Sequence, residues 1–344
     1  DASLALYADT ILRPRFDAKE TERLRAQWLA QIAQEKTQPN SLALRLLPPL
    51  MYGKDHVYGI PFTGSGTVES IESLSRDDLL AFHRNWLRPD NATLIIVGDT
   101  TFAEIKPLLE KHLGEWTAPD AALATLDRHR VQQPKQPRVY LIDQPGAIQA
   151  NILLGQVIPP TADETSLAFD IANGVFGGTF TSRINMNLRE DKSWSYGARA
   201  NASNAVGQRP WIDKTGAAIV EIRRELSEFL GDKPASTEEI AKIRAMRVRS
   251  LPGAFETGSA VLTAIGSIVR YDRPDDYVQA LRQRIESISD AQANRAAQVL
   301  DPNAMTWVVV GELDKIEAPV RALKLGEVQL LDADGQPVDR KAGD

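Results

Sequence analysis

Two kinds of hydrophobic pattern alternate along the chain. In some stretches apolar residues recur every three or four positions, as expected for an amphipathic helix. Residues 1–12 are an example, with one face formed by Leu4, Ala8, Ile11 and Leu12. Elsewhere the apolar residues are consecutive and rich in Ile and Val, as in 93–97 and 306–310, which predicts short buried strands ended by Gly98 and Gly311. The sequence therefore predicts a mixed α+β fold.

The second half of the chain contains most of the predicted elements. A strand over 138–156 is interrupted by the turn-forming pair Pro145-Gly146. The periodicity then predicts helices over 163–175, 180–190, 215–230 and 237–249, and a strand over 194–203. Only Trp211–Asp213 are left between that strand's turn and the next helix, which is short for a returning antiparallel strand.

Three segments recur later in the chain at a nearly constant distance. SIESLSRDD (70–78) returns as RIESISDAQ (284–292), PDNATLIIVGD (89–99) as PNAMTWVVVGE (302–312), and TERLRAQWL (21–29) as TEEIAKIRA (237–245), with offsets of 214, 213 and 216. In both copies a serine, Ser75 or Ser289, is placed to cap a helix N-terminus. Three matches in the same order indicate a tandem duplication of one unit.

The duplication divides the chain into four parts. We predict a first unit over 1–118 that contains only its second half, a linker over 119–136, a nearly whole unit over 137–325, and a tail over 326–344 that ends in polar and glycine residues. Asp1 then corresponds to about residue 217, so roughly 80 residues of the first copy have no counterpart. Either the chain is a fragment or a partner supplies the rest.

Composition and charge exclude several classes of function. The 40 basic and 46 acidic residues give a net charge of −6 without a basic run, which disfavours nucleic-acid binding. No stretch approaches the 18 consecutive apolar residues of a membrane span. The chain has no cysteine, which excludes disulfides, thiolate metal sites and cysteine nucleophiles.

No self-contained catalytic or metal site is evident. The four histidines, His56, His83, His112 and His129, are never three or four residues apart, so no helix presents a histidine pair to a metal. FTGSGT (62–67) lacks the lysine of a phosphate-binding loop and predicts a turn. WSYG (194–197) lacks the glycine that precedes the serine in a nucleophile elbow. We therefore predict no metal-ligating and no cofactor-binding residue.

One stretch carries a recognisable combination of polar residues. FGGTFTSRINMNLREDKSWSYGARA (176–200) contains Gly-Gly, then Ser-Arg at 182–183, then Leu188-Arg189-Glu190, with Tyr196 seven residues after Arg189. It resembles the Arg/Tyr signature of the pitrilysin/insulinase family of zinc peptidases, the inverzincins. Three further blocks, 12–35, 56–79 and 85–99, resemble successive parts of one unit of that family.

The resemblance implies a fold and a role. The fold is α+β, with tandem pitrilysin-like units that each contain a mainly antiparallel sheet with helices on one face, the first unit being incomplete here. Two halves of such a peptidase close over a peptide, and zinc is held by H-x-x-E-H and a later Glu on the N-terminal half. Arg189 and Tyr196 would reach across from the C-terminal half to donate hydrogen bonds to the substrate carbonyl. The partner would be that N-terminal half or a separate subunit in a heterodimer, the substrate an extended peptide, and the location periplasmic or otherwise exported.

The departures from the family support the assignment to a C-terminal half. No H-x-x-E-H segment is present, and Gln31 occupies the position of the later zinc-binding Glu. Glutamine is a poor zinc ligand, and Glu35, one turn further along the same helix, is the only substitute. The resemblance thus implies zinc in the complete enzyme, none on this chain, and no peptidase activity of this chain alone.

Two alternatives remain open. The first is a catalytically inactive scaffold similar to the core subunits of the respiratory cytochrome bc complex, which keeps the fold without the chemistry. The second is a small-ligand enzyme that uses GSGT (64–67) or FGGT (176–179) as an anion site. The spacing of Arg189 and Tyr196 argues against the first, and phosphate binding would reveal the second.

Overall fold

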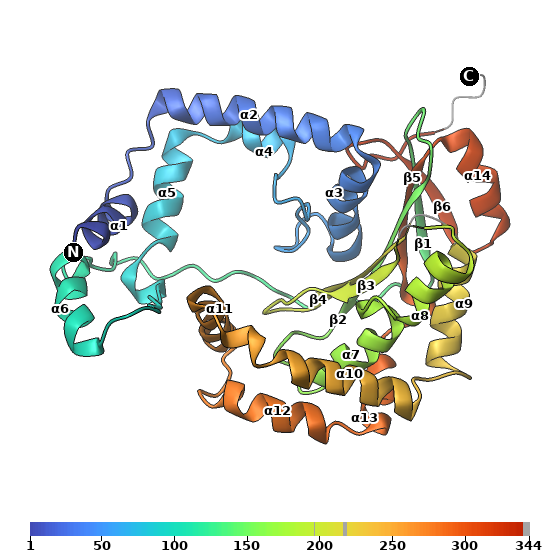
Figure 1. The fold of residues 1–344 in the computed structure, drawn as a ribbon. Helices are drawn as coiled ribbons and strands as arrows, with labels where there is room; N and C mark the ends of the chain where they lie inside the picture. Colours follow the sequence, from blue (N-terminus) through green and yellow to red (C-terminus); the bar gives the residue numbers. More distant parts are fainter. Residues whose placement is uncertain (196, 216–218, 340–344) are drawn as a thin grey trace. The chain divides into compact units, whose positions relative to one another are not determined.

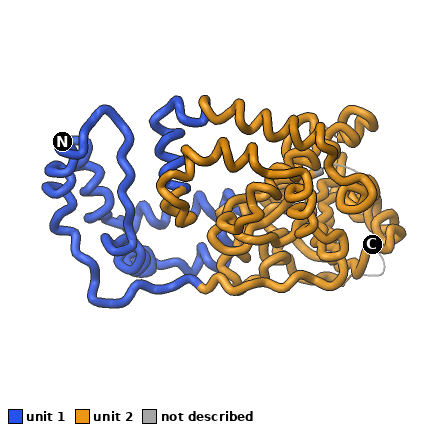
Figure 2. Tube along the Cα trace, turned by 90° about the horizontal axis from the view of Figure 1, so that it is seen from below, with its two compact units in different colours: residues 1–32, 66–126, 253–267 blue, residues 33–65, 127–252, 268–344 orange. Residues whose placement is uncertain are grey.

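A computed structural model describes residues 1–195, 197–215 and 219–339, which fall into two compact units. Unit 1 comprises residues 1–32, 66–126 and 253–267, and unit 2 comprises 33–65, 127–252 and 268–344 (Figure 2). These units are spatial, so the boundaries predicted for the two sequence copies and their linker stay a prediction. Among the described residues, no helix combines the length and the apolar composition that a membrane span requires.

Unit 2 is built around one six-stranded sheet with the order β3-β4-β2-β5-β1-β6. Its strands are β1 (Arg138–Asp143), β2 (Asn151–Ile158), β3 (Arg199–Ala202), β4 (Arg209–Thr215), β5 (Thr306–Gly311) and β6 (Glu327–Leu331). The pairs β3–β4, β4–β2 and β2–β5 are antiparallel, whereas β5–β1 and β1–β6 are parallel. The predicted mixed α+β fold with a mainly antiparallel sheet is therefore confirmed.

The helices that belong to the second copy cover one face of this sheet (Figure 1). Two of them continue as π-helical turns: α7 (Ser166–Asn173) continues as η2 (Gly174–Gly178), and α8 (Arg183–Asn185) continues as η3 (Met186–Asp191). The others are α9 (Ile219–Leu230), α10 (Thr237–Ser250), α12 (Tyr277–Ser287), α13 (Asp290–Ala297) and α14 (Leu313–Ala322). Their apolar sides form one core with Trp211, Trp307 and Phe176. This layer carries the Arg189 segment.

The opposite face is covered by α3 (Pro39–Tyr52), a helix from the first copy's part of the sequence (Figure 1). A second core forms there from Leu42, Leu46 and Leu47 against the strand residues Leu153 and Val308. A glycine makes the close approach possible, because a Cβ at Gly155 of β2 would overlap the sulfur of Met51. Both faces of the sheet are therefore buried, which agrees with the fully buried β5.

Unit 1 is helical in its described residues. It contains α1 (Ala2–Leu12), the greater part of α2 (Ala18–Thr37), α4 (Val68–Ser73), α5 (Arg76–Trp86), α6 (Phe102–Leu113), the short η1 (Pro89–Asn91), η4 (Gly253–Phe255) and most of α11 (Gly258–Arg270). The strand predicted over 93–97 is not formed: Leu94 and Ile96 are 43% and 40% exposed, and the segment pairs with no described strand. A strand needs a neighbour to bond its N–H and C=O groups, and apolar composition alone does not supply one.

Four predictions change in unit 2. The returning strand that looked too short is β4, whose seven residues pair with β2 and of which Trp211–Lys214 also pair with β3. The helix predicted over 215–230 accordingly begins at Ile219 rather than within the strand. Among the described residues of the strand predicted over 194–203, only Arg199–Ala202 pair in the sheet. In the predicted tail, Glu327–Leu331 form the edge strand β6. Sheet pairing, a long-range property, decided each of these differences.

Candidate functional site

Arg189 lies on the π-helical turn η3, next to the buried Leu188. Its side chain is 41% exposed and its Nε lies 3.3 Å from Glu190 Oε1, while its guanidinium stacks 4.7 Å from the centre of the Phe180 ring. An ion pair with this much exposure contributes about 0–1 kcal/mol, so it does not lock the side chain in place. The turn thus presents a positive, multidentate hydrogen-bond donor at the surface of unit 2.

The predicted partner, Tyr196, lies outside the described residues, but the residues on both sides of it are tied to the same turn. The backbone N–H groups of Trp194 and Ser195 donate to the Leu188 carbonyl at 2.9 and 3.3 Å. After position 196, the N–H of Ala198 donates to Asn185 Oδ1 at 3.1 Å. Chain segments before and after residue 196 are therefore anchored to the segment that carries Arg189, and the pairing of Arg189 with Tyr196 stays a prediction.

Asn185 is a buried residue whose supporting contacts near the Arg189 turn the sequence did not reveal. It is 3% exposed, and besides accepting from Ala198 it donates Nδ2–H to the Phe180 carbonyl at 2.6 Å. One buried amide thus holds both the loop with Phe180, which stacks on Arg189, and the start of β3. The signal in the sequence is weak: Asn185 lies between the apolar residues Ile184 and Met186. A polar side chain that is buried in this way needs hydrogen-bond partners.

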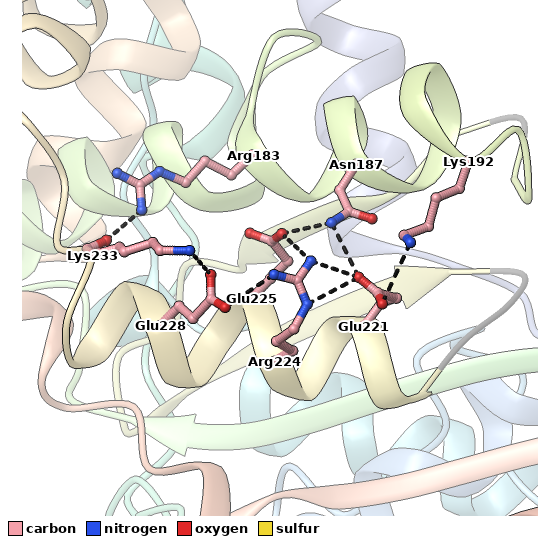
Figure 3. Close-up of polar contacts among 8 residues, drawn as sticks. All are labelled: Arg183, Asn187, Lys192, Glu221, Arg224, Glu225, Glu228 and Lys233. Carbon is pink, nitrogen blue, oxygen red and sulfur yellow. Dashed lines mark hydrogen bonds and ion pairs between the residues drawn. The ribbon is translucent and has the colours of Figure 1, made fainter.

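A polar network fastens the η3 turn to α9 (Figure 3). Asn187 Nδ2 donates to Glu225 Oε1 at 2.6 Å and to Glu221 Oε2 at 3.2 Å, and Lys192 Nζ lies 3.5 Å from Glu221 Oε1. Arg224 then joins both glutamates, at 2.7 Å and 3.0 Å. The hydrogen bond from Arg224 is the largest cause that holds the pKa of Glu221 below its ordinary value. The lowered pKa favours the charged form of Glu221, and its hydrogen bond from Asn187 is therefore charge-assisted.

Arg183, the arginine of the Ser-Arg pair, is used inside unit 2. Its guanidinium bonds the Glu239 carboxylate of α10 at 2.8 and 2.6 Å, donates to the Pro234 carbonyl at 2.9 Å and also bonds the Lys233 carbonyl. The pKa of Glu239 is lowered to about 2, first by the hydrogen bond from Arg183 and then by backbone and Coulombic contacts. Arg183 is therefore engaged in structural contacts, whereas Arg189 of the Leu-Arg-Glu run has a side chain that is 41% exposed.

The glycines of the motif are explained by packing. A Cβ at Gly177 would lie 2.7 Å from the Ala200 backbone nitrogen, so only glycine lets η2 approach β3 this closely. The other glycine-rich stretch is a turn, as predicted, with Gly64 and Gly66 at φ values of 73° and 72° and Ser65 buried between them. Neither stretch needs a bound anion to account for its glycines.

The candidate ligands Glu35 and Gln31 do not fit a zinc ion. Glu35, the candidate substitute ligand, is buried and accepts from Arg45 Nη1 at 2.7 Å and from Ser65 Oγ at 2.6 Å. Gln31 is exposed on α2 and carries an amide rather than a carboxylate. No cluster of three or more His, Asp or Glu side chains suited to a metal occurs within 1–195, 197–215 and 219–339.

The histidines make other contacts. His56 lies 3.1 Å, through Nε2, from the His129 carbonyl, and its Nδ1 accepts from the Tyr58 N–H at 3.0 Å. His83 Nε2 lies 2.6 Å from the Ile11 carbonyl, and His112 Nε2 lies 2.5 Å from Asp1 Oδ1. Each histidine nitrogen in these contacts is engaged by a backbone or carboxylate group, so none of them is set up to share a metal.

Comparison with known proteins identifies relatives of this arrangement. A family model described as "Peptidase M16 inactive domain" matches residues 73–245. The uncharacterized zinc protease YmxG of Bacillus subtilis is 25% identical over 194 residues, which are 56% of this chain and 45% of YmxG. The chain thus spans less than half of that relative's length.

Two solved structures share the fold. The peptidase M16 inactive domain from Pseudomonas fluorescens aligns with a TM-score of 0.79 at 21% identity, over 90% of this chain and 74% of that one. The periplasmic protease PqqL from Escherichia coli aligns with a TM-score of 0.69 at 15% identity, over 95% of this chain and 37% of that one. At these identities the likeness concerns the fold alone.

Proposed function

Because the chain belongs to the peptidase M16 family, which it matches through the domain described as inactive, we propose that it is the substrate-binding half of a zinc metallopeptidase. The zinc would be held by an N-terminal half or partner subunit, because Glu35 and Gln31 of this chain do not fit the metal. The observation that carries the proposal is the mounting of Arg189: its turn is fastened to α9 by Asn187, while its guanidinium is exposed. Rigid support behind an exposed donor is what a substrate-binding arginine requires.

In this role Arg189 and Tyr196 bind the substrate rather than the metal. A guanidinium presents several N–H donors in a fixed plane and a phenol presents one O–H, and both suit a peptide carbonyl oxygen. The edge strand β3 lies beside the same segment, since Asn185 bonds Ala198 just before it. An extended peptide adding to the outer edge of β3 would bring its backbone carbonyls toward Arg189. As PqqL is described as periplasmic, we extend the proposal to an exported protein.

The test uses the assembled peptidase, in which this chain is paired with the zinc-bearing half. Arg189→Ala and Tyr196→Phe should each lower peptide turnover and leave the zinc content unchanged. Arg282→Ala is the matched control, because Arg282 is 70% exposed, pairs only along α12 with Glu286, and should leave turnover unchanged. Loss of zinc in either site variant would place these residues at the metal and refute the assignment.

A second candidate is an inactive scaffold of the same fold. It is favoured by the match to a family model that is described as an inactive domain. The same experiment separates the two functions, since a scaffold would retain its assembly and show no turnover for either variant to lower.

A further inference from the structure

Unit 1 contains an apolar groove of about 630 Å³ between α2, α4 and the start of α5. Its floor and walls include Leu24 and Trp28 of α2, Ile71 of α4, and Leu74 and Leu79. Leu24, Trp28 and Leu74 are 51%, 40% and 39% exposed. Three large apolar side chains that line one groove and remain open to water mark a surface that is normally covered.

The second sequence copy shows what covers these positions. By the repeat offsets, Leu24, Ile71, Leu74 and Leu79 correspond to Ile240, Ile285, Ile288 and Ala293. All four counterparts are buried, with exposures of 0%, 2%, 8% and 0%. They belong to the core of unit 2, where α7 packs against α10 and α13. In unit 2 the corresponding groove is therefore filled by α7.

The walls of the two grooves are built alike. Ser75 and Ser289 each cap a helix through a complete capping box at corresponding positions. In each copy an arginine of the long helix, one turn apart in the two alignments, donates to the corresponding carbonyl: Arg25 to Leu74 O at 2.5 Å, and Arg244 to Ile288 O at 2.7 Å. The helices that line the unit 1 groove are thus held by contacts similar to those around the unit 2 groove, which α7 fills.

We propose that the unit 1 groove is the docking site for a second helix of the α7 type, supplied by polypeptide outside these 344 residues. The inference rests on the tandem organisation of the proposed function. The chemistry of the occupant follows from α7, whose buried residues include Ala168, Phe169 and Ala172. A small residue is also needed one turn later, because a Cβ at Gly174 would lie 2.8 Å from Ile243 Cγ2 of α10. The partner is an amphipathic helix with one aromatic anchor and small residues that allow close approach.

The test joins residues 163–178 as an extra segment before Asp1 through a flexible linker of about 20 Gly and Ser residues, which raises the effective concentration of the helix. In this fusion, backbone amides of α2 around Leu24 and Trp28 should exchange hydrogen at least about tenfold more slowly, because docking suppresses local opening. Binding of an apolar fluorescent dye should fall in parallel. The matched fusion carries Phe169→Asp and Ala172→Asp in the added segment only, and should behave like the unfused chain.

Two further variants locate the effect. Leu24→Arg in the fusion should abolish the protection, whereas Phe102→Arg should retain it, because Phe102 is a 78% exposed apolar residue of unit 1 outside the groove. Equal protection by the native and the Asp-substituted segments, or none by either, would overturn the proposal. So would a dimer of the unfused chain that Leu24→Arg dissociates, since it would assign the groove to a second copy. None of these readouts uses peptide turnover, so their failure leaves the role of Arg189 untouched.

Discussion

Asn187 of the η3 turn donates to Glu225 of α9 at 2.6 Å, a contact between residues 38 positions apart in the sequence. It joins the turn that carries Arg189 to a regular helix whose apolar side is buried in the core of unit 2. A π-helical turn is poorly stabilised by its own backbone, and such turns are frequent at functional sites. The external amide-to-carboxylate bond supplies support that the turn itself lacks.

Asn187→Ala should therefore loosen the mounting of Arg189. Removing the amide leaves Glu221 and Glu225 with one donor fewer, and the loss of a hydrogen bond to a charged group costs about 1.5–3 kcal/mol. We expect a lower urea midpoint for the chain and lower peptide turnover of the assembled enzyme, with unchanged zinc. Gln329→Ala, an exposed position on β6, is the control. Reduced turnover with an unchanged urea midpoint would instead indicate that Asn187 itself contacts the substrate.

Local signals in the sequence predicted the parts of the fold that depend on neighbouring residues. The caps at Ser75 and Ser289, the Pro145-Gly146 turn and the helix before Arg13 are all present. Elements that depend on distant pairing were predicted less well. The segment 93–97 has the composition of a strand but no described partner, whereas β4 is a full strand because β2 and β3 flank it.

The same distinction separates the predicted from the missed site residues. Arg189 could be predicted as a site residue because its motif is contiguous in the sequence. Asn187 is in the same motif, but its role depends on α9, which no spacing rule connects to it. Glu35 was considered as a metal ligand because it lies one turn beyond Gln31. Its actual partners, Arg45 and Ser65, lie 10 and 30 residues away, and only the fold brings them together.

Asp213 of β4 provides a test based on pH. It is fully buried opposite Leu154 and Ala200, and neither carboxyl oxygen has a hydrogen-bond partner among the residues that the structure describes. Burial raises its pKa from 3.8 to about 8. Because the folded pKa is above the unfolded one, the folded state holds the proton more tightly. The associated stability is fully present below about pH 4 and is lost as the pH rises toward about 8.

Asp213→Asn should flatten this dependence, because the amide does not ionise. The free energy of unfolding of the wild-type chain should fall by on the order of 1 kcal/mol per pH unit relative to the variant between pH 5 and pH 8. Urea unfolding at these two pH values measures the difference. Asp120→Asn, at an exposed position of unit 1, should keep the wild-type slope. Identical slopes for Asp213→Asn and the wild type would show that this carboxyl does not carry the dependence.

Substitution of Glu35 distinguishes a structural role of this residue from a metal-binding role. The Arg45–Glu35 pair is buried, with side-chain exposures of 6% and 11%, and Ser65 donates to the same carboxylate oxygen. Glu35→Ala leaves the guanidinium of Arg45 in the interior without its carboxylate, which costs about 3–5 kcal/mol for a pair of this kind. Glu110→Ala removes an exposed pair with Lys106 and should cost less than about 1 kcal/mol. Urea unfolding of the two variants should show this contrast.

Zinc analysis of the purified chain completes the argument about Glu35. The wild type and Glu35→Ala should both contain near-zero zinc, and Gln31→Glu should not create a site, because no histidine pair lies near enough to complete one. Chains made with and without added zinc should also unfold at the same urea concentration, since a bound metal would stabilise the folded state. One zinc per wild-type chain that is lost in Glu35→Ala would overturn the structural role. It would also return Glu35 to the metal site that the family resemblance first suggested.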